Sequence, residues 1–267
     1  MEKSSAKLWE NTPGVEGVGT IIRYFPPYID EVSDAAIIAF PGGAYRGLSR
    51  HEGEGYGEFF ACKGFHVFSV DYHTIPHRFP TQLLEARRAV RFVRAHAAEY
   101  GIDPHKILVI GSSAGGHLTA MLSTYTHPIE GEGVDDIDKE PFLPNAQALC
   151  YPVICCPDNE ELCHMESYRN LLDGRNEELE RAVDPSKNVT ENTPPAFLFH
   201  TAADQSVNVI NSYEYAAALR RHGVPHELHV FPKGIHGMGV WLEDPHNHQW
   251  TSLLVNWIRH LGWMKEG

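Results

Sequence analysis

Short, continuously apolar runs alternate with stretches of helical periodicity along this chain of 267 residues. The apolar runs are predicted to be strands at 35–40, 65–72, 106–111, 146–154, 195–202 and 225–231. The intervening patterns predict helices at 52–64, 80–100, 114–125, 207–222 and 248–261. Strands that are apolar on both faces and joined through helices form a mostly parallel sheet covered on both sides. The sequence therefore predicts an α/β fold with a doubly wound sheet.

Two long stretches lack this alternation. One is the acidic segment 126–145 and the other is 157–194, whose helical pattern is weak. Irregular segments of this length inside a compact domain are usually functional loops. No internal repeat and no linker rich in Pro, Gly or Ser divides the sequence. We therefore expect a single domain over 1–267, with both insertions on the same edge of the sheet, where they would shape or cover the active site.

The charge balance limits the possible partners. The chain has 22 Lys and Arg against 35 Asp and Glu, for a net charge of −13. Nucleic acids and anionic membranes are bound by a concentrated basic face, so neither is an expected partner. The densest basic cluster has helical spacing and is predicted to be the solvated face of one helix. Its members are Arg87, Arg88, Arg91 and Arg94.

The compartment and the assembly state are less constrained. No apolar run approaches the ~18 residues of a membrane span, and no apolar signal segment is visible near residue 1. The five cysteines lack the CxxC spacing of redox and zinc sites, since Cys155 and Cys156 are adjacent. We therefore expect the cysteines to be thiols and the protein to lie in the reducing cytoplasm. The sequence leaves homo-oligomer formation open.

The segment "GSSAGG", 111–116, lies between a predicted strand and a predicted helix. It contains G-x-S-x-G, a strand-to-helix turn so tight that the positions two before and two after the serine must be small. Centred on Ser113, those positions are Gly111 and Gly115; centred on Ser112, one would be the bulky Ile110. Ser113 is therefore the candidate nucleophile. A plain glycine-rich turn is the alternative, although no GxxxxGK[ST] sequence supports a nucleotide-binding loop.

A serine nucleophile needs a histidine base, and the histidine needs a carboxylate that fixes its tautomer. In this type of fold the acid and the histidine follow later strands, in that order. Asp204 follows the strand at 195–202, and His236 follows the strand at 225–231. Among the other late histidines, His246 and His248 form an HxH pair without acids or thiols at metal-ligand spacing, so no metal is expected. Ser113, Asp204 and His236 are the predicted triad.

Stabilising the oxyanion of an acyl-transfer intermediate requires backbone N–H groups near the nucleophile. Gly42 and Gly43 directly follow the strand at 35–40, and glycines allow their amides to face a substrate without an intervening side chain. The amide of Ala114, next to the serine, is the other expected donor. An ordinary Pro-Gly turn is the alternative for this segment.

Five segments in this order resemble the α/β-hydrolase esterases grouped with hormone-sensitive-lipase and acetyl-xylan-esterase-like proteins. They are "FPGGAY", "VDYH", "FPTQLLEARRAVRFVRAHAAEYGIDPHKILVIGSSAGGHL", "HTAADQSV" and "GIHGMG", and the resemblance covers roughly 35–260. Family members typically carry His-Gly-Gly-Gly where this chain has Pro41-Gly42-Gly43-Ala44. The proline form is more similar to the small carbohydrate esterases.

The resemblance implies two-step hydrolysis of short acyl esters, such as acetyl groups on sugars or xylo-oligosaccharides, without a metal or organic cofactor. A small-molecule ester, and an acylated carbohydrate in particular, is the partner it implies. Candidate pocket residues are Tyr45, Tyr72 and His73. Two alternatives remain open: an amide or peptide hydrolase similar to formamidases or prolyl oligopeptidases, and a binding protein built on an inactive hydrolase scaffold.

Overall fold

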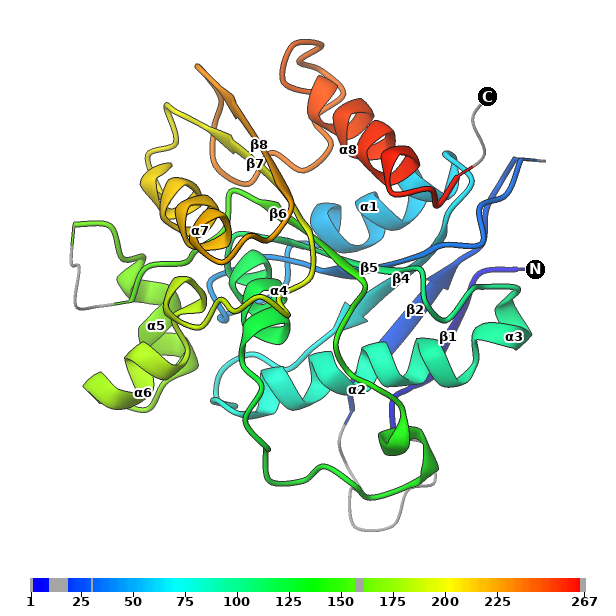
Figure 1. Ribbon diagram of the computed structural model, residues 1–267, viewed down its shortest axis with the longest axis horizontal. Coiled ribbons are helices and arrows are strands. Elements are labelled where there is room, and N and C mark those ends of the chain that lie inside the picture. The colour runs from blue at the N-terminus through cyan, green and yellow to red at the C-terminus, as the bar shows by residue number, and fades with distance from the viewer. Residues whose placement is uncertain (1, 10–18, 30, 157–160, 265–267) are drawn as a thin grey trace.

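The computed structural model describes residues 2–9, 19–29, 31–156 and 161–264 (Figure 1). They form an eight-stranded sheet in the order β1-β2-β4-β3-β5-β6-β7-β8. The strands β3 to β8 are parallel, which confirms the predicted doubly wound, mostly parallel sheet. Their bounds are Ala36–Phe40 (β3), His66–Asp71 (β4), Ile107–Ser112 (β5), Ala146–Cys150 (β6), Ala196–Thr201 (β7) and His226–Phe231 (β8).

Two antiparallel strands complete one edge of the sheet and were not predicted. They are β1, Ser4–Lys7, and β2, Ile21–Phe25, which pair with each other, and β2 also pairs with β4. The sequence signal of β1 is weak because its four residues, SSAK, carry no apolar alternation. β6 ends at Cys150 rather than 154, because Tyr151 has a positive φ of 37° and turns the chain out of the sheet.

Helices cover both faces of the sheet (Figure 1). α2 (Thr81–Ala95), α4 (Ala114–Thr124) and α7 (Ile210–Arg221) pack on one face, and α1 (Arg50–Ala61) and α8 (Gln249–His260) on the other. Alternate residues of β3 supply both cores: Ile38 packs in the cluster of α2, and Ile37 in the cluster of α1 and α8. The helix predicted at 80–100 breaks at His96, after which α3 covers Ala97–Tyr100. Within the described ranges, no helix has the length and apolarity to cross a membrane.

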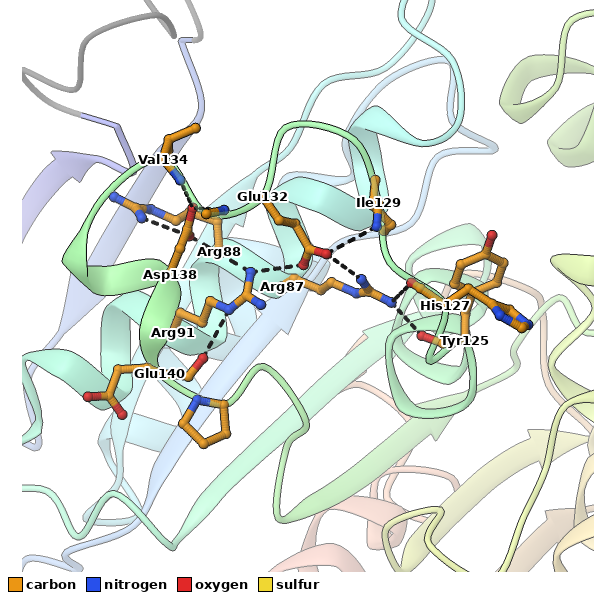
Figure 2. Close-up of polar contacts among 12 residues, drawn as sticks. Arg87, Arg88, Arg91, Tyr125, His127, Ile129, Glu132, Val134, Asp138 and Glu140 are labelled. Carbon is orange, nitrogen blue, oxygen red and sulfur yellow. Dashed lines mark hydrogen bonds and ion pairs between the residues drawn. The ribbon is translucent and has the colours of Figure 1, made fainter.

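The arginine cluster on α2 is not a solvated face, which corrects the prediction from its spacing. The side chains of Arg87 and Arg88 are 0% and 2% exposed. Figure 2 shows them bonded to the segment that follows α4, with Arg87 on Glu132 at 3.0 Å and Arg88 on Asp138 at 2.9 Å. Arg91 and Arg94 bond to main-chain oxygens of the same segment. The four arginines therefore bind the acidic segment 126–145 of the same chain, here called the acidic belt.

The two irregular segments lie at different ends of the strands, contrary to the expectation of a shared edge. Segment 126–145 joins the end of α4 to the start of β6 and contains a short 3-10 helix, η1 (Asp136–Lys139). It therefore lies at the amino end of the parallel strands. Segment 157–194 follows the carboxyl end of β6; its described part contains α5 (Met165–Leu171), α6 (Glu177–Ala182) and a 3-10 helix, η2 (Pro185–Lys187).

Replacing Arg88 by methionine should lower the free energy of unfolding by about 3–5 kcal/mol, because a buried carboxylate and a partly exposed one would lose the cation to which they are hydrogen-bonded. The carboxylates are those of Asp135 and Asp138. Urea unfolding of the two proteins measures the difference. The matched control is Arg50→Met, whose side chain is 82% exposed and pairs with Glu54 on the surface; its cost should stay below about 1 kcal/mol. Equal costs for the two variants would contradict the inferred role of the belt.

Candidate active site

The turn between β5 and α4 has the geometry that its small residues suggest. Ser113 sits at φ 53° and ψ −119°, a conformation that L-residues rarely adopt. A Cβ atom on Gly115 would overlap the carbonyl oxygen of Phe40, and one on Gly111 would overlap the carbonyl oxygen of Gly115. Neither position can therefore carry a side chain. The other serine, Ser112, is fully buried, and its hydroxyl bonds to that of Tyr56 at 2.8 Å.

The structure brings Ser113, His236 and Asp204 together from three separate loops at the carboxyl ends of β5, β8 and β7. His236 Nε2 lies 2.8 Å from Ser113 Oγ, and His236 Nδ1 lies 2.7 Å from Asp204 Oδ2. An ionised carboxylate only accepts hydrogen bonds, so the ring proton is on Nδ1 and Nε2 is free to accept the serine proton. This is the tautomer that a general base requires.

The Asp204 carboxylate is strongly stabilised in its ionised form. Burial acts to raise its pKa, but hydrogen bonds from His200 and His236 outweigh that effect and hold the pKa well below its usual range. The amides of Ser206 and Val207 also donate to Oδ1, at 2.8 and 2.9 Å. Asp204 therefore stays ionised under any condition in which an esterase works, and its position is fixed from both sides.

The loop after β3 supplies amides next to Ser113, but not the pair that the sequence suggested. The N–H of Gly42 donates to Glu52 Oε2 at 2.9 Å, so it does not face a substrate, and its expected donor role is corrected. In the described part of the chain, the amides of Gly43, Ala44 and Ala114 donate no hydrogen bond to protein. Gly43 and Ala44 have positive φ angles, 131° and 54°, which turn this loop sharply beside the nucleophile. These three amides are the candidate donors for an oxyanion.

Two of the three expected pocket residues lie beneath this loop instead of lining a pocket. Tyr45 is fully buried with its hydroxyl on His117 Nδ1 at 2.8 Å, and Tyr72 is buried with its hydroxyl on the Pro41 carbonyl at 2.6 Å. This corrects their assignment, because hydroxyls committed to protein partners inside the core cannot contact a substrate. His73 is partly exposed, and its ring bonds to the buried carboxylate of Glu85.

His117, which supports Tyr45, should make stability depend on pH. Burial lowers its pKa to about 4, whereas an unfolded histidine titrates near about 6.5. Between these values the unfolded chain binds the extra proton, so the stability present above pH of about 6.5 is lost as the pH falls toward about 4, by on the order of 3 kcal/mol. Urea unfolding across this range should show the slope in the natural protein and a shallower slope in His117→Phe. Identical slopes would contradict the prediction.

α5 places the described part of the segment 157–194 next to the site. Asn170 Nδ2 donates to the carbonyl of Ala44 at 2.8 Å, and Glu166 pairs with Arg46 at 2.8 Å. The pKa of His164, which precedes α5, is lowered by burial and by the neighbouring His236. The described part of this segment therefore contacts the loop that carries the free amides. Among the described residues, no group of three or more His, Cys, Asp or Glu side chains is arranged to hold a metal ion.

Three residues of the site were not found from the sequence. Ala44 has no polar side chain, and what it offers the site is a backbone amide without a protein partner among the described residues. Glu52 and Tyr151 are buried at the site but belong to no motif, since Glu52 is one acidic residue of the "HEGEGYGE" stretch. Their contacts run between elements distant in sequence, so only the assembled fold reveals them.

The chain is similar to several known proteins. The BD-FAE family model matches residues 24–219. An endo-1,4-beta-xylanase B of Butyrivibrio fibrisolvens is 35% identical over 79% of this chain and 33% of that protein. An acetylxylan esterase of Xylanibacter ruminicola is 29% identical over 100% of this chain and 53% of its own length. The chain thus spans between a third and about half of these curated relatives.

Solved structures have the same fold. An acetyl ester-xyloside bifunctional hydrolase from Caldicellulosiruptor lactoaceticus superposes with a TM-score of 0.89 at 33% identity, covering 98% of this chain and 97% of that one. An alpha/beta hydrolase from a deep-sea metagenome library superposes with a TM-score of 0.72 at 25% identity, covering 97% and 96%. These similarities confirm the expected α/β-hydrolase fold.

Proposed function

Because the chain belongs to the BD-FAE family, we propose that it is a serine carboxylic-ester hydrolase whose triad is Ser113, His236 and Asp204. The observation that carries this proposal is the continuous hydrogen-bond chain from Ser113 Oγ through His236 to Asp204, at 2.8 and 2.7 Å. A serine hydroxyl on a strained turn, with a correctly protonated histidine beside it, is the arrangement that nucleophilic acyl transfer requires.

In the first half-reaction, His236 Nε2 takes the proton of Ser113 Oγ as this oxygen attacks the acyl carbonyl. The resulting oxyanion would accept hydrogen bonds from the amides of Ala114 and of the loop at Gly43 and Ala44, each worth on the order of 3 kcal/mol. His236 then gives the proton to the departing alcohol, leaving an acyl ester on Ser113. In the second half-reaction, water gives a proton to His236 as its oxygen attacks the acyl carbon. His236 then returns this proton to Ser113 Oγ as the bond between Oγ and the acyl carbon breaks, which releases the acid and restores the serine.

The proposed substrates are short acyl esters of sugars, with acetylated xylo-oligosaccharides as the leading case. The supporting observation is that similar proteins are described as an acetylxylan esterase and as an acetyl ester-xyloside hydrolase. The position of α5 beside the loop of Ala44 supports a pocket with a wall provided by residues 161–194. A cytoplasmic location belongs to the same proposal, because Cys62, Cys150 and Cys155 are thiols, and thiols persist in reducing compartments.

The test is a substrate panel with the natural protein and Ser113→Ala. The panel contains p-nitrophenyl acetate and butyrate, acetylated xylo-oligosaccharides, N-formylkynurenine and a proline anilide. We expect acetate release from p-nitrophenyl acetate and from the acetylated xylo-oligosaccharides, and slower turnover of p-nitrophenyl butyrate. Ser113→Ala should lose turnover of every substrate. Faster cleavage of an amide than of every ester would overturn the ester assignment. No turnover of any member by the natural protein would overturn the hydrolase assignment.

A further inference from the structure

We propose that Glu52 is a positioning residue. Its buried carboxylate holds both the loop after β3, which carries the amides of Gly43 and Ala44, and the loop after β8, which carries His236. This inference rests on the proposed function and adds a residue that acts through others rather than on the substrate. Glu52 lies in the first turn of α1 and is 1% exposed. A carboxylate is costly to bury unless hydrogen bonds compensate it, so its presence here calls for partners.

The partners of Glu52 come from two different loops. Oε2 accepts the amide of Gly42 at 2.9 Å, and Oε1 accepts the hydroxyl of Tyr151 at 2.7 Å. The same phenol oxygen accepts the amide of Gly239, three residues beyond His236, at 2.9 Å. Both carboxylate oxygens are thus engaged, one directly with the loop after β3 and one through Tyr151 with the loop after β8.

The first arm fixes the direction of a proposed oxyanion donor. Gly42 is held at both ends, because its amide donates to Glu52 and its carbonyl accepts the amide of Ser49 at 2.9 Å. The peptide unit is planar, so the Gly42 carbonyl and the Gly43 amide point in opposite directions. Holding the carbonyl toward Ser49 therefore turns the Gly43 N–H the other way. Without Glu52, the Gly42 amide would be buried without a partner, and the loop would lose one of the two hydrogen bonds that hold Gly42, with only the bond from Ser49 left to orient the Gly43 N–H.

The second arm fixes the loop that carries the base. The ring of Tyr151 packs edge-on against the ring of His236, with centroids 5.1 Å apart. His51, the neighbour of Glu52, donates from Nε2 to the carbonyl of Gly237 at 2.7 Å. Two consecutive residues of α1 therefore hold the main chain that follows His236. A misplacement of about 1 Å between reacting groups costs roughly 10²-fold in rate, so this arm should act on kcat.

The experiment compares kcat and KM for p-nitrophenyl acetate in three variants. Glu52→Ala should lower kcat by roughly 100-fold, with KM changed by less than about threefold. Tyr151→Phe removes only the second arm and should lower kcat by about tenfold. Glu52→Gln keeps an oxygen that accepts the Gly42 amide, so it should recover at least about tenfold of the loss caused by alanine. If Glu52→Ala does not fold, the kcat values of Glu52→Gln and Tyr151→Phe test the proposal.

Two control carboxylates separate positioning from folding. Glu54 is on the same helix and pairs with exposed Arg50, so Glu54→Ala should match the natural protein. Asp138 belongs to the acidic belt, pairs with Arg88 of α2, and has a side chain that is 4% exposed. Asp138→Ala should lower the melting temperature but not the kcat of folded molecules. Equal kcat in Glu52→Ala and Asp138→Ala, or a change confined to KM, would overturn the proposal. Retained turnover in Ser113→Ala would instead refute the proposed function itself.

Discussion

Replacing Ser113 by alanine should lower kcat for p-nitrophenyl acetate by roughly 10⁵-fold or more, which is the scale of removing a triad nucleophile. The reason is that no acyl-enzyme can form when Oγ is missing, while the binding surface stays intact. The alanine must adopt the same strained φ near 53° as Ser113, so we expect a small loss of stability. The fold should be preserved. Steady-state kinetics and circular dichroism of the two proteins measure both effects.

The neighbouring serine is the matched control for this prediction. Ser112 is adjacent in the same turn and fully buried, and it bonds to Tyr56 instead of His236. Ser112→Ala should keep kcat within a few-fold of the natural value and lose about 1 kcal/mol of stability with that hydrogen bond. An inactive Ser112→Ala beside an active Ser113→Ala would show that the nucleophile has been assigned to the wrong hydroxyl.

Replacing Asp204 by asparagine should lower kcat at neutral pH by about 10⁴-fold. The amide nitrogen of asparagine would donate to His236 Nδ1, which moves the ring proton to Nε2 and leaves no acceptor for the serine proton. The geometry would change little, since the side-chain oxygen could still accept the amides of Ser206 and Val207. Steady-state kinetics at pH near 7 would measure the loss, with thermal unfolding as the check on folding.

The pKa of Asp204 also constrains the pH profile expected of the natural protein. Because its pKa is held well below the usual value of about 3.9, its carboxylate remains ionised throughout the working range. The stability that it contributes is therefore complete above about pH 4 and is lost only as the pH falls further.

The control for Asp204→Asn is Asp244→Asn, a substitution in the loop before α8, which should leave kcat unchanged. An Asp204→Asn variant within tenfold of natural activity would mean that Asp204 only caps the turn at Ser206.

The candidate site could be predicted from the sequence because its parts are tied to strand ends. Ser113, Asp204 and His236 each follow an apolar run, and parallel strands bring their carboxyl ends to one edge of the sheet. Small residues at Gly111 and Gly115 distinguished between the two serines without any three-dimensional information. Whether these three residues perform the chemistry stays a prediction until the variants are measured.

What the sequence did not reveal depends on partners distant along the chain. Helical spacing suggested an exposed face for Arg87 and Arg88, but their carboxylates lie 45 or more residues away, at Glu132 and Asp138. The amide of Gly42 was expected to face the substrate because glycine places no side chain in the way, yet this amide donates its hydrogen bond to Glu52. Local periodicity reports which residues share a face, not what covers that face.

The three predicted catalytic residues come from loops after β5, β7 and β8, and β8 is the last strand of the sheet. A growing chain therefore has its nucleophile long before its base. His236 can reach Ser113 only once β8 has paired with β7 and the loop beyond it has been made. Synthesis thus sets the earliest moment at which the predicted triad can assemble: a nascent chain cannot form it before β8 and the loop beyond it have been made and have folded onto β7.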